Sequence, residues 1–390
     1  ISTSGSQTYK GGTSLSGDTT LSGTTASFSQ SLNAGGNDLA LNLSGLTTFT
    51  QGASSLKNFS SLGDIALAGN FSTSGSQTYS GNVSLLGDSR LSGTNASFAN
   101  GLNGGGNQLT MDFSGTFDTT NFVNLATLNL IGSGTTVLTG TNPNSGGITV
   151  ENGTVVGTTD SLLGAITNNG TVRFDQSSEG TYAGVMSGSG SLEKNGNGTV
   201  TLSGNNTYSG GTTVNNGTLV GTTTSLQGAI TNNGTVRFDQ STDGAYAEVL
   251  SGTGSLEKNG NGTVTLSGIN TYSGGTTINN GTLAGTTTSL QGAITNNGGV
   301  TFNQDTDGIY AGSMSGTGSL EKSGDGTVTL SGANTYTGGT TVNGGILAGT
   351  TDSLQGDITN SGTVRFDQST DGTYSGAMSG TGSLEKNGSG

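Results

Sequence analysis

The sequence of 390 residues contains no cysteine, no histidine and no tryptophan, and it has a single proline, Pro143. Without histidine and cysteine, the usual nucleophile and base pairs of enzymes and most transition-metal sites are excluded. The absence of cysteine also suits a chain that stays unfolded while it crosses an oxidising compartment, because no disulfide can form on the way. The composition therefore agrees with export and disfavours the commoner kinds of catalysis.

Basic side chains are scarce, with 10 Lys and Arg against 24 Asp and Glu and a net charge of -14. This balance, without any basic cluster, disfavours nucleic-acid binding. The negative charge is spread too thinly to keep the chain expanded, and the apolar residues fall in regular clusters bounded by turn residues. We therefore expect a folded chain.

Long hydrophobic runs are also missing, so the sequence shows no signal peptide and no transmembrane stretch. It begins with Ile1 and ends on Asn387-Gly388-Ser389-Gly390, inside a repeated segment. We expect the chain to be a fragment of a longer protein.

The main feature that is present is a 64-residue unit, which occurs in four copies without insertion or deletion. Ser191-Leu192-Glu193-Lys194 returns at residues 255–258, 319–322 and 383–386. Two aromatic series keep the same step, namely Phe174, Phe238, Phe302 and Phe366, and Tyr182, Tyr246, Tyr310 and Tyr374. A fixed period over such a length is typical of stacked repeat architectures.

Turn residues divide the repeats into short strands. The 75 glycines, many in Asn-Gly and Gly-Gly pairs, separate runs rich in Val, Thr, Leu and Phe, and segments such as Gly198–Gly204 alternate polar and apolar side chains. Short strands without helical crossovers leave antiparallel sandwich modules or a parallel β-helix, and we favour a parallel β-helix of roughly 21 residues per turn, about three turns per unit. The predicted inward residues are Val214, Leu219, Ile230, Val236 and Phe238, and the predicted corners are Asn215-Asn216-Gly217 and Asn232-Asn233-Gly234.

A natural variation within the repeats supports the strand assignment. Three copies read Arg173-Phe174-Asp175, Arg237-Phe238-Asp239 and Arg365-Phe366-Asp367, whereas the third copy reads Thr301-Phe302-Asn303. Residues two apart on a strand share a face. We therefore predict an exposed Arg–Asp ion pair within each strand, worth at most about 1 kcal/mol, with the Phe turned inward.

The first part of the chain repeats with a different, 70-residue period. Residues 2–9 return as residues 72–79, and Gly35-Gly36-Asn37 returns at residues 105–107. We predict two regions of β-helix, residues 1–133 and 134–390, with the second continuous with the first.

The string from Gly190 to Leu219 resembles the passenger-associated repeat of bacterial autotransporters. It recurs from Gly254 and Gly318, and in weakened form from Gly134, where Thr141-Asn142-Pro143-Asn144 departs from the pattern. The string Thr73–Gly81 is similar to repeats of filamentous-haemagglutinin-like exoproteins of type V secretion.

These resemblances imply a right-handed parallel β-helix that reaches the extracellular surface of a Gram-negative bacterium. They also imply an outer-membrane translocator outside this chain and a role in adhesion, aggregation or biofilm contacts. The partners would be host or bacterial surface glycans or proteins, or further copies of the chain in a filament. No small-molecule substrate, no cofactor and no catalytic, cofactor-binding or metal residues are expected.

An enzyme acting on polysaccharides stays an alternative, because paired carboxylates suffice for glycoside hydrolysis. The best local candidates are Asp305 and Asp307, with Asp243 and Asp371 at related corners. We interpret these acids as exposed turn formers before glycine, because they belong to the repeat and do not interrupt it.

Other binding sites have weaker support. Gly35-Gly36-Asn37-Asp38 is a lone partial match to calcium-binding nonapeptides, so we expect no specific calcium site. Tyr208, Tyr272 and Tyr336 recur beside Gly-Gly corners and could stack on sugar rings, but we expect them at the edge of the core with each hydroxyl in water. Irregular spacing of Thr doublets such as Thr222-Thr223 disfavours ice binding. The favoured hypothesis is a non-enzymatic stalk with adhesive sides.

Overall fold

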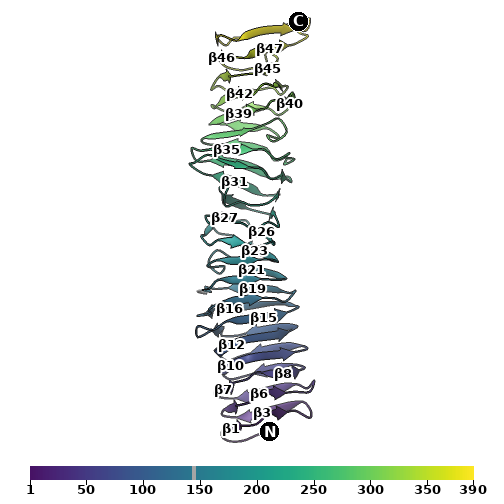
Figure 1. The fold of residues 1–390 in the computed structure, drawn as a ribbon, viewed down its shortest axis with the longest axis vertical. Coiled ribbons are helices and arrows are strands. Elements are labelled where there is room, and N and C mark those ends of the chain that lie inside the picture. The colour runs from purple at the N-terminus through teal and green to yellow at the C-terminus, as the bar shows by residue number, and fades with distance from the viewer. Residues whose placement is uncertain (143–145) are drawn as a thin grey trace. The chain divides into compact units, whose positions relative to one another are not determined.

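The computed structural model describes residues 1–142 and 146–390, and this part of the chain contains β-strands and no α-helix. Pro143 and Asn144, two residues of the atypical string named above, lie outside the described residues. The chain forms two compact units, unit 1 (residues 1–195 and 204–210) and unit 2 (residues 196–203 and 211–390). Each unit is a stack of parallel strands (Figure 1), so the predicted parallel β-helix is confirmed within each.

The strands of unit 1 are β1 (Gln7–Tyr9), β2 (Thr13–Ser14), β3 (Thr19–Gly23), β4 (Ala26–Phe28), β5 (Leu32–Asn33), β6 (Leu39–Leu43), β7 (Thr47–Phe49), β8 (Ala53–Leu56), β9 (Phe59–Ser61), β10 (Ile65–Thr73), β11 (Ser76–Tyr79), β12 (Val83–Gly93), β13 (Asn95–Phe98), β14 (Leu102–Asn103), β15 (Leu109–Phe113), β16 (Thr116–Thr120), β17 (Phe122–Val123), β18 (Leu128–Leu130), β19 (Thr135–Thr139), β20 (Ile148–Val150), β21 (Thr154–Gly157), β22 (Ile166–Asn168), β23 (Thr171–Asp175), β24 (Gly180–Tyr182), β25 (Met186–Ser187) and β26 (Ser191–Asn195).

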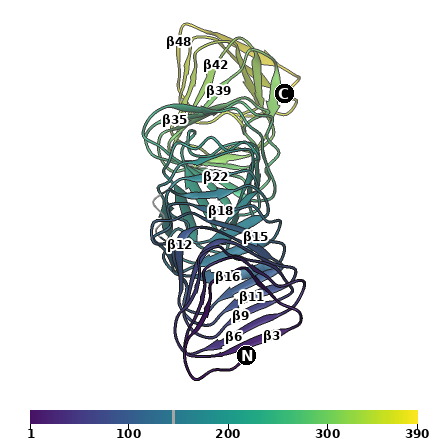
Figure 2. The ribbon, with the colours of Figure 1, turned by 60° about the horizontal axis from the view of Figure 1, so that its bottom comes forward.

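Three sheets line unit 1. The largest has 15 strands and runs from β1 to β25, the second has the order β13-β11-β9-β6-β3, and the third includes β16-β19-β21-β23-β26. Figure 2 shows β3, β6, β9 and β11 side by side in the second sheet. Because neighbours in each sheet come from successive turns, every turn contributes strands to several faces.

The strands of unit 2 are β27 (Thr199–Leu202), β28 (Thr212–Val214), β29 (Thr218–Gly221), β30 (Ile230–Asn232), β31 (Thr235–Asp239), β32 (Gly244–Tyr246), β33 (Leu250–Ser251), β34 (Ser255–Asn259), β35 (Thr263–Leu266), β36 (Thr276–Ile278), β37 (Thr282–Gly285), β38 (Ile294–Asn296), β39 (Gly299–Asn303), β40 (Gly308–Tyr310), β41 (Met314–Ser315), β42 (Ser319–Ser323), β43 (Thr327–Leu330), β44 (Thr340–Val342), β45 (Ile346–Gly349), β46 (Ile358–Asn360), β47 (Thr363–Asp367), β48 (Met378–Gly380) and β49 (Ser383–Asn387).

The strands of unit 2 form four runs of hydrogen-bonded neighbours. The first is β27-β29-β31-β34-β36-β38-β41, and the second is β32-β35-β37-β39-β42-β44-β46-β48. The third is β40-β43-β45-β47-β49, and the fourth is β28-β30-β33. All their pairings within the described residues are parallel.

The sequence period is longer than three turns. In the first run of unit 2, Val200 pairs with Leu219, Leu219 with Val236, and Val236 with Leu256. These three turns contain 19, 17 and 20 residues, fewer than the predicted length of roughly 21 residues. Three turns therefore end at Leu256, whereas the counterpart of Val200 in the next copy is Val264, which lies on β35 in the second run.

Equivalent strands of successive copies therefore lie in different sheets. The strand that carries the repeated Phe is β31 in copy two, β39 in copy three and β47 in copy four. These three strands belong to the first, second and third run of unit 2. If the repeat unit were three whole turns long, these three strands would lie in one sheet. Each copy therefore includes part of a fourth turn, and the equivalent surface of the next copy faces a different direction.

The interior consists of the side chains predicted to point inward. Val214, Leu219, Ile230, Val236 and Phe238 are all fully buried. Removing a side chain of this size from water contributes about 1.5–3 kcal/mol to folding. In copy two the ring of Phe238 lies 5.2 Å from the ring of Tyr246, so both aromatic series of the repeat meet inside the coil.

In unit 1 the 70-residue period is visible as repeated ring stacking. Tyr9 stacks on Phe28 at 4.6 Å, and Tyr79 stacks on Phe98 at 4.9 Å. The pairing of Gln7 with Ala26 likewise recurs as the pairing of Gln77 with Ala96.

Glycine is required where corners of adjacent turns touch. Gly217, at a predicted corner, has a φ of +67°, a conformation that L side chains rarely adopt. A Cβ atom on Gly234, one turn later, would lie 2.5 Å from the carbonyl oxygen of Gly217. The corners therefore need glycine both for backbone conformation and for close approach.

The predicted ion pairs within strands are wrong for two copies. Arg173 pairs with Glu193 and Arg237 with Glu257, each at 2.6 Å, because the register places that Glu directly beside the Arg on the next turn. In the fourth copy Arg365 does pair with the Asp of its own strand, Asp367, at 2.9 Å. The repeated Phe points inward in all four copies.

We predict that Phe302→Ala lowers the free energy of unfolding by about 3–5 kcal/mol, because it leaves a cavity between two turns. Thr301→Ala, on the outer face of the same strand, should change it by no more than about 0.5 kcal/mol. Urea unfolding followed by circular dichroism measures both. An effect of Thr301→Ala as large as that of Phe302→Ala would contradict the assignment of Phe302 to the inward face of β39.

Candidate functional site

The acids that the sequence offered as catalytic candidates lie at exposed corners, where three of them bind the backbone of the next turn. The carboxylate of Asp243 accepts a hydrogen bond from the N–H of Thr263 at 2.7 Å, and that of Asp307 accepts one from Thr327 at 2.8 Å. The hydrogen bond from the N–H of Thr327 holds the pKa of the Asp307 carboxyl below its usual range. The geometry of both hydrogen bonds agrees with the interpretation of these residues as turn formers.

Asp305 and Asp371 complete this set. Asp305 accepts a hydrogen bond from the N–H of Asp325 at 3.2 Å, and Asp371 is exposed on its corner. In residues 1–142 and 146–390, no group of three or more His, Cys, Asp or Glu side chains lies close enough together to hold a metal ion. The candidate acids are thus not gathered into one cluster of side chains.

The partial calcium motif also serves to join turns. Asp38 accepts hydrogen bonds from the backbone N–H of Asn58 at 3.0 Å and from its side-chain amide at 3.1 Å. Asn37 donates to the carbonyl oxygen of Ala34 at 2.8 Å. Both side chains of the motif are engaged with the protein itself.

The tyrosines beside the Gly-Gly corners are buried, which corrects the expectation of hydroxyls in water. Tyr208, Tyr272 and Tyr336 expose at most 3% of their surface. The hydroxyl of Tyr272 is hydrogen-bonded to that of Thr276 at 2.8 Å, and burial raises the pKa of Tyr272. Because these rings face the interior, none of the three offers a surface for stacking on sugars.

A repeated buried lysine is the feature that the sequence interpretation missed. Lys194, Lys258 and Lys322 are completely buried. The ammonium group of Lys258 donates to the carbonyl oxygens of Asn259 and Gly260 at 2.7 Å, and to that of Asn280 on the next turn at 3.3 Å. Lys322 makes the same three kinds of bond, so Lys258 and Lys322 each fix a corner to the turn that follows. Burial lowers the pKa of all three lysines.

Nearby acids partly offset the cost of burying these cations, and they differ between copies. Asp239 and Asp243 raise the pKa of Lys258, against the lowering caused by burial. Copy three has Asn303 where copy two has Asp239, and there Asp305 and Asp325 act on Lys322 in the same sense. The candidate acid Asp305 thus replaces a missing charge beside a buried lysine.

The lysine position could have been found from strand alternation. In Leu192-Glu193-Lys194, residues two apart share a face, so an inward Leu192 requires an inward Lys194. The general rule that lysine is almost never fully buried argued against this placement. The carbonyl oxygens of the corner make the exception possible.

Buried amides join turns in the same way. Asn232 donates to the carbonyl oxygen of Ser255 at 2.8 Å and accepts from the N–H of Gly234 at 3.1 Å. Asn296 and Asn360 repeat both bonds. The interior polar groups are therefore structural.

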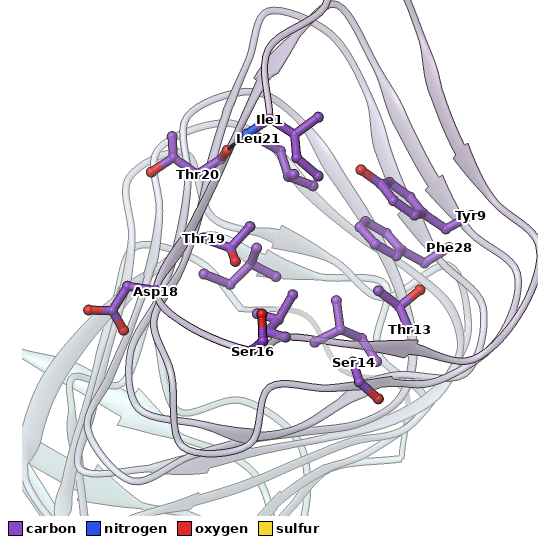
Figure 3. A pocket seen from close by; sticks show the side chains of 13 residues that line it. Ile1, Tyr9, Thr13, Ser14, Ser16, Asp18, Thr19, Thr20, Leu21 and Phe28 are labelled. Atoms are coloured by element: carbon purple, nitrogen blue, oxygen red, sulfur yellow. Dashed lines mark hydrogen bonds between the residues drawn. The ribbon is translucent and has the colours of Figure 1, made fainter.

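A cavity of about 380 Å³ lies among the first turns of unit 1. Figure 3 shows Tyr9 and Phe28 on one side and Ile1 and Leu21 near its rim, with Asp18 turned away from them. Asp18 accepts a hydrogen bond from the N–H of Asp38 at 2.9 Å, as the other corner acids do. The cavity is thus lined in part by buried core side chains, and Asp18 points away from it.

No helix in the described part of the chain is long and apolar enough to span a membrane. The features that recur are outer faces and corners, so the candidate functional surface is the side of each solenoid.

We predict that Lys258→Leu destabilises the fold less than Lys258→Ala, because Leu130 fills the equivalent buried position 64 residues before Lys194. The wild-type lysine has a lowered pKa when folded, so the unfolded chain binds more protons above that value. The free energy of unfolding should therefore rise between the lowered pKa and the ordinary value of 10.5, and Lys258→Leu should reduce this increment to the part that Lys194 and Lys322 contribute.

The measurement is urea unfolding of wild type and variants at several pH values from neutral to about 10.5. Lys386→Leu, at the exposed equivalent position, is the control and should leave the pH dependence unchanged. An increment of unchanged size in Lys258→Leu would show that burial does not lower the pKa of Lys258.

Comparison with known proteins agrees with the repeat analysis. The family model of the passenger-associated-transport-repeat matches residues 128–156, 192–220, 256–284 and 320–348. The four matches begin at the same position of the 64-residue unit. No solved structure matches this chain significantly.

A curated protein named as an adhesin, the BmaC autotransporter of Brucella suis biovar 1 (strain 1330), is similar to part of the chain. The two are 34% identical over 170 residues, which are 36% of this chain and 5% of the adhesin. The similarity of residues 73–81 to filamentous-haemagglutinin-like exoproteins stays a prediction. The repeat matches and this relative confirm the first resemblance: the 64-residue unit carries the passenger-associated-transport repeat, and part of the chain is similar to an autotransporter.

Proposed function

We propose that this chain is a non-enzymatic passenger region that stands on the outer surface of a Gram-negative bacterium and contributes to adhesion. The observation that carries the proposal is the use of polar side chains: corner acids, buried lysines and buried amides all bind neighbouring turns. The printed name of the similar autotransporter, an adhesin, supports the same role. The partners we propose are surface glycans or proteins, with export through an outer-membrane translocator.

The outer surface of the repeat faces a different direction in each successive copy, which suits contact with a partner along the sides of the solenoid. Because equivalent strands of copies two, three and four lie in three different sheets, the same outer surface is presented in three directions within unit 2. A partner then meets a similar surface from several approaches. This arrangement favours many weak contacts over one pocket.

The competing hypothesis of a polysaccharide-acting enzyme has less support. The carboxylates of Asp243, Asp305 and Asp307 each bind a backbone N–H of the next turn. Glycoside hydrolysis instead requires two carboxyl groups that flank one bond of the substrate.

The test is attachment of bacteria that display the chain, with a translocator alone as background. We predict attachment above background to at least one member of a panel of immobilised extracellular proteins and glycans. Deleting residues 320–383 should keep both folding and attachment, because residue 319 then meets Leu384 in the Ser-Leu-Glu-Lys junction that already links the copies. Loss of attachment in a folded deletion variant would contradict contact distributed along the repeats.

The same chain should release no reducing ends from a panel of polysaccharides. Release that Asp305→Asn abolishes would overturn the non-enzymatic assignment in favour of the hydrolase. In our account Asp305→Asn lowers stability slightly, because it removes a negative charge near Lys322.

A further inference from the structure

Three exposed aliphatic side chains of unit 2 form a column, which we call the aliphatic stripe: Val249, Ile269 and Ile309. They expose 40%, 71% and 66% of their surface. Single exposed aliphatic residues are common on soluble proteins and need no explanation. The stripe differs because its members are aligned and because no other copy has a large aliphatic residue at the position of Ile269 or of Ile309, although Val185 of copy one is equivalent to Val249.

Backbone hydrogen bonds place the first two members on adjacent turns. The N–H of Thr271 donates to the carbonyl oxygen of Leu250 at 2.8 Å, which sets Leu250 beside Asn270. Val249 therefore lies directly beside Ile269. Adjacent turns are about 4.8 Å apart, so the two side chains are neighbours.

The third member lies two turns further along the same column. The N–H of Asn270 donates to the carbonyl oxygen of Thr288 at 3.1 Å, which sets Ile269 beside Thr288. A Cβ atom on Gly308 would lie 2.1 Å from the hydroxyl oxygen of Thr287, so Ile309 follows Thr288 on the next turn. The stripe spans four turns, with the exposed Thr288 between the two isoleucines.

The repeat provides an internal comparison for these positions. The residues equivalent to Ile269 are Asn205 in copy one and Ala333 in copy three, and those equivalent to Ile309 are Thr181, Ala245 and Thr373 in copies one, two and four. The inward positions of Val236 and Phe238 keep their apolar character in all four copies, whereas here two outward positions of one column become large and apolar together. The folded core does not require this change.

The charge around the stripe has a single sign. Between residues 238 and 364 the only basic side chains are Lys258 and Lys322, and both are completely buried. The same span carries ten acids that are exposed or half-buried: Asp239, Asp243, Glu248, Glu257, Asp305, Asp307, Glu321, Asp325, Asp352 and Asp357. The outer surface of this span therefore offers negative charge and no exposed positive charge.

We infer that the aliphatic stripe, with the acids around it, is a docking surface for a polypeptide that presents aliphatic side chains flanked by Lys or Arg. Apolar contact would supply adhesion at the stripe, and opposite charge would steer and orient the partner. A second copy of this chain would bring the same acids and be repelled, and an anionic lipid surface would be repelled as well. The inference rests on the proposed adhesive function and names the chemistry of one partner.

The test uses the full chain and three fluorescein-labelled octapeptides: alternating Lys and Val, alternating Lys and Ser, and alternating Glu and Val. Fluorescence anisotropy measures binding of each to wild type and to the double variant Ile269→Asn/Ile309→Thr. Both replacements are residues that other copies carry at these positions, so the fold is expected to tolerate them. Ala245→Thr/Ala333→Asn makes comparable changes at equivalent exposed positions and is the control.

We expect wild type to bind the Lys–Val peptide most tightly, and the Ile269→Asn/Ile309→Thr variant to bind it at least ten-fold more weakly. The control variant should bind as wild type does, and raising the salt concentration should weaken binding. Unchanged binding by the double variant, or equal binding of the Lys–Ser peptide by wild type, would overturn the inference. Circular dichroism and thermal unfolding of each variant confirm that the fold is kept.

Two further outcomes would assign the stripe to a different occupant and also overturn the inference. One is a wild-type dimer in sedimentation velocity that the double variant abolishes. The other is stripe-dependent binding to phosphatidylcholine vesicles. Attachment of displaying bacteria, measured separately, distinguishes failure of this inference from failure of the adhesive function, because attachment that persists in the double variant leaves the latter in place.

Discussion

Backbone hydrogen bonding between successive turns is the constraint on which the rest of each unit depends. Every turn pairs in parallel with the turn before and the turn after, so its path must match both neighbours. Corners can then approach closely only where no Cβ intervenes, as at Gly217 and Gly234. The abundance of glycine and the small set of core residues both follow from this requirement.

The same constraint determines what the polar side chains do. A corner leaves carbonyl and N–H groups that the strand ladder does not satisfy, and buried polar groups of this kind are costly unless they are paired. Lys258 satisfies three carbonyl oxygens, Asn232 joins two turns, and Asp243 binds an N–H one turn away. Residue types that often mark catalytic or binding sites are thus part of the scaffold, and the surface between them is left for recognition.

Much of this architecture could be predicted from the sequence, because the periodicity and the alternation of side chains report directly on strands and faces. The inward positions of Val236 and Phe238 were correct for that reason. The direction of each copy could not be predicted, since the period counts residues along the chain whereas successive turns differ in length. For the same reason the partner of Arg237 was misassigned: choosing between Asp239 and Glu257 requires the register between turns.

The central claim is that one 64-residue unit spans three turns and part of a fourth. Because the natural chain has no cysteine, spin labels can be placed on engineered cysteines alone. Thr277 lies on the same face as Thr335, three turns away and about 14 Å distant, whereas its repeat equivalent, Thr341, lies on β44 in another sheet. Pulsed dipolar spectroscopy should give a shorter distance for Thr277 to Thr335 than for Thr277 to Thr341, and the reverse order would contradict the account.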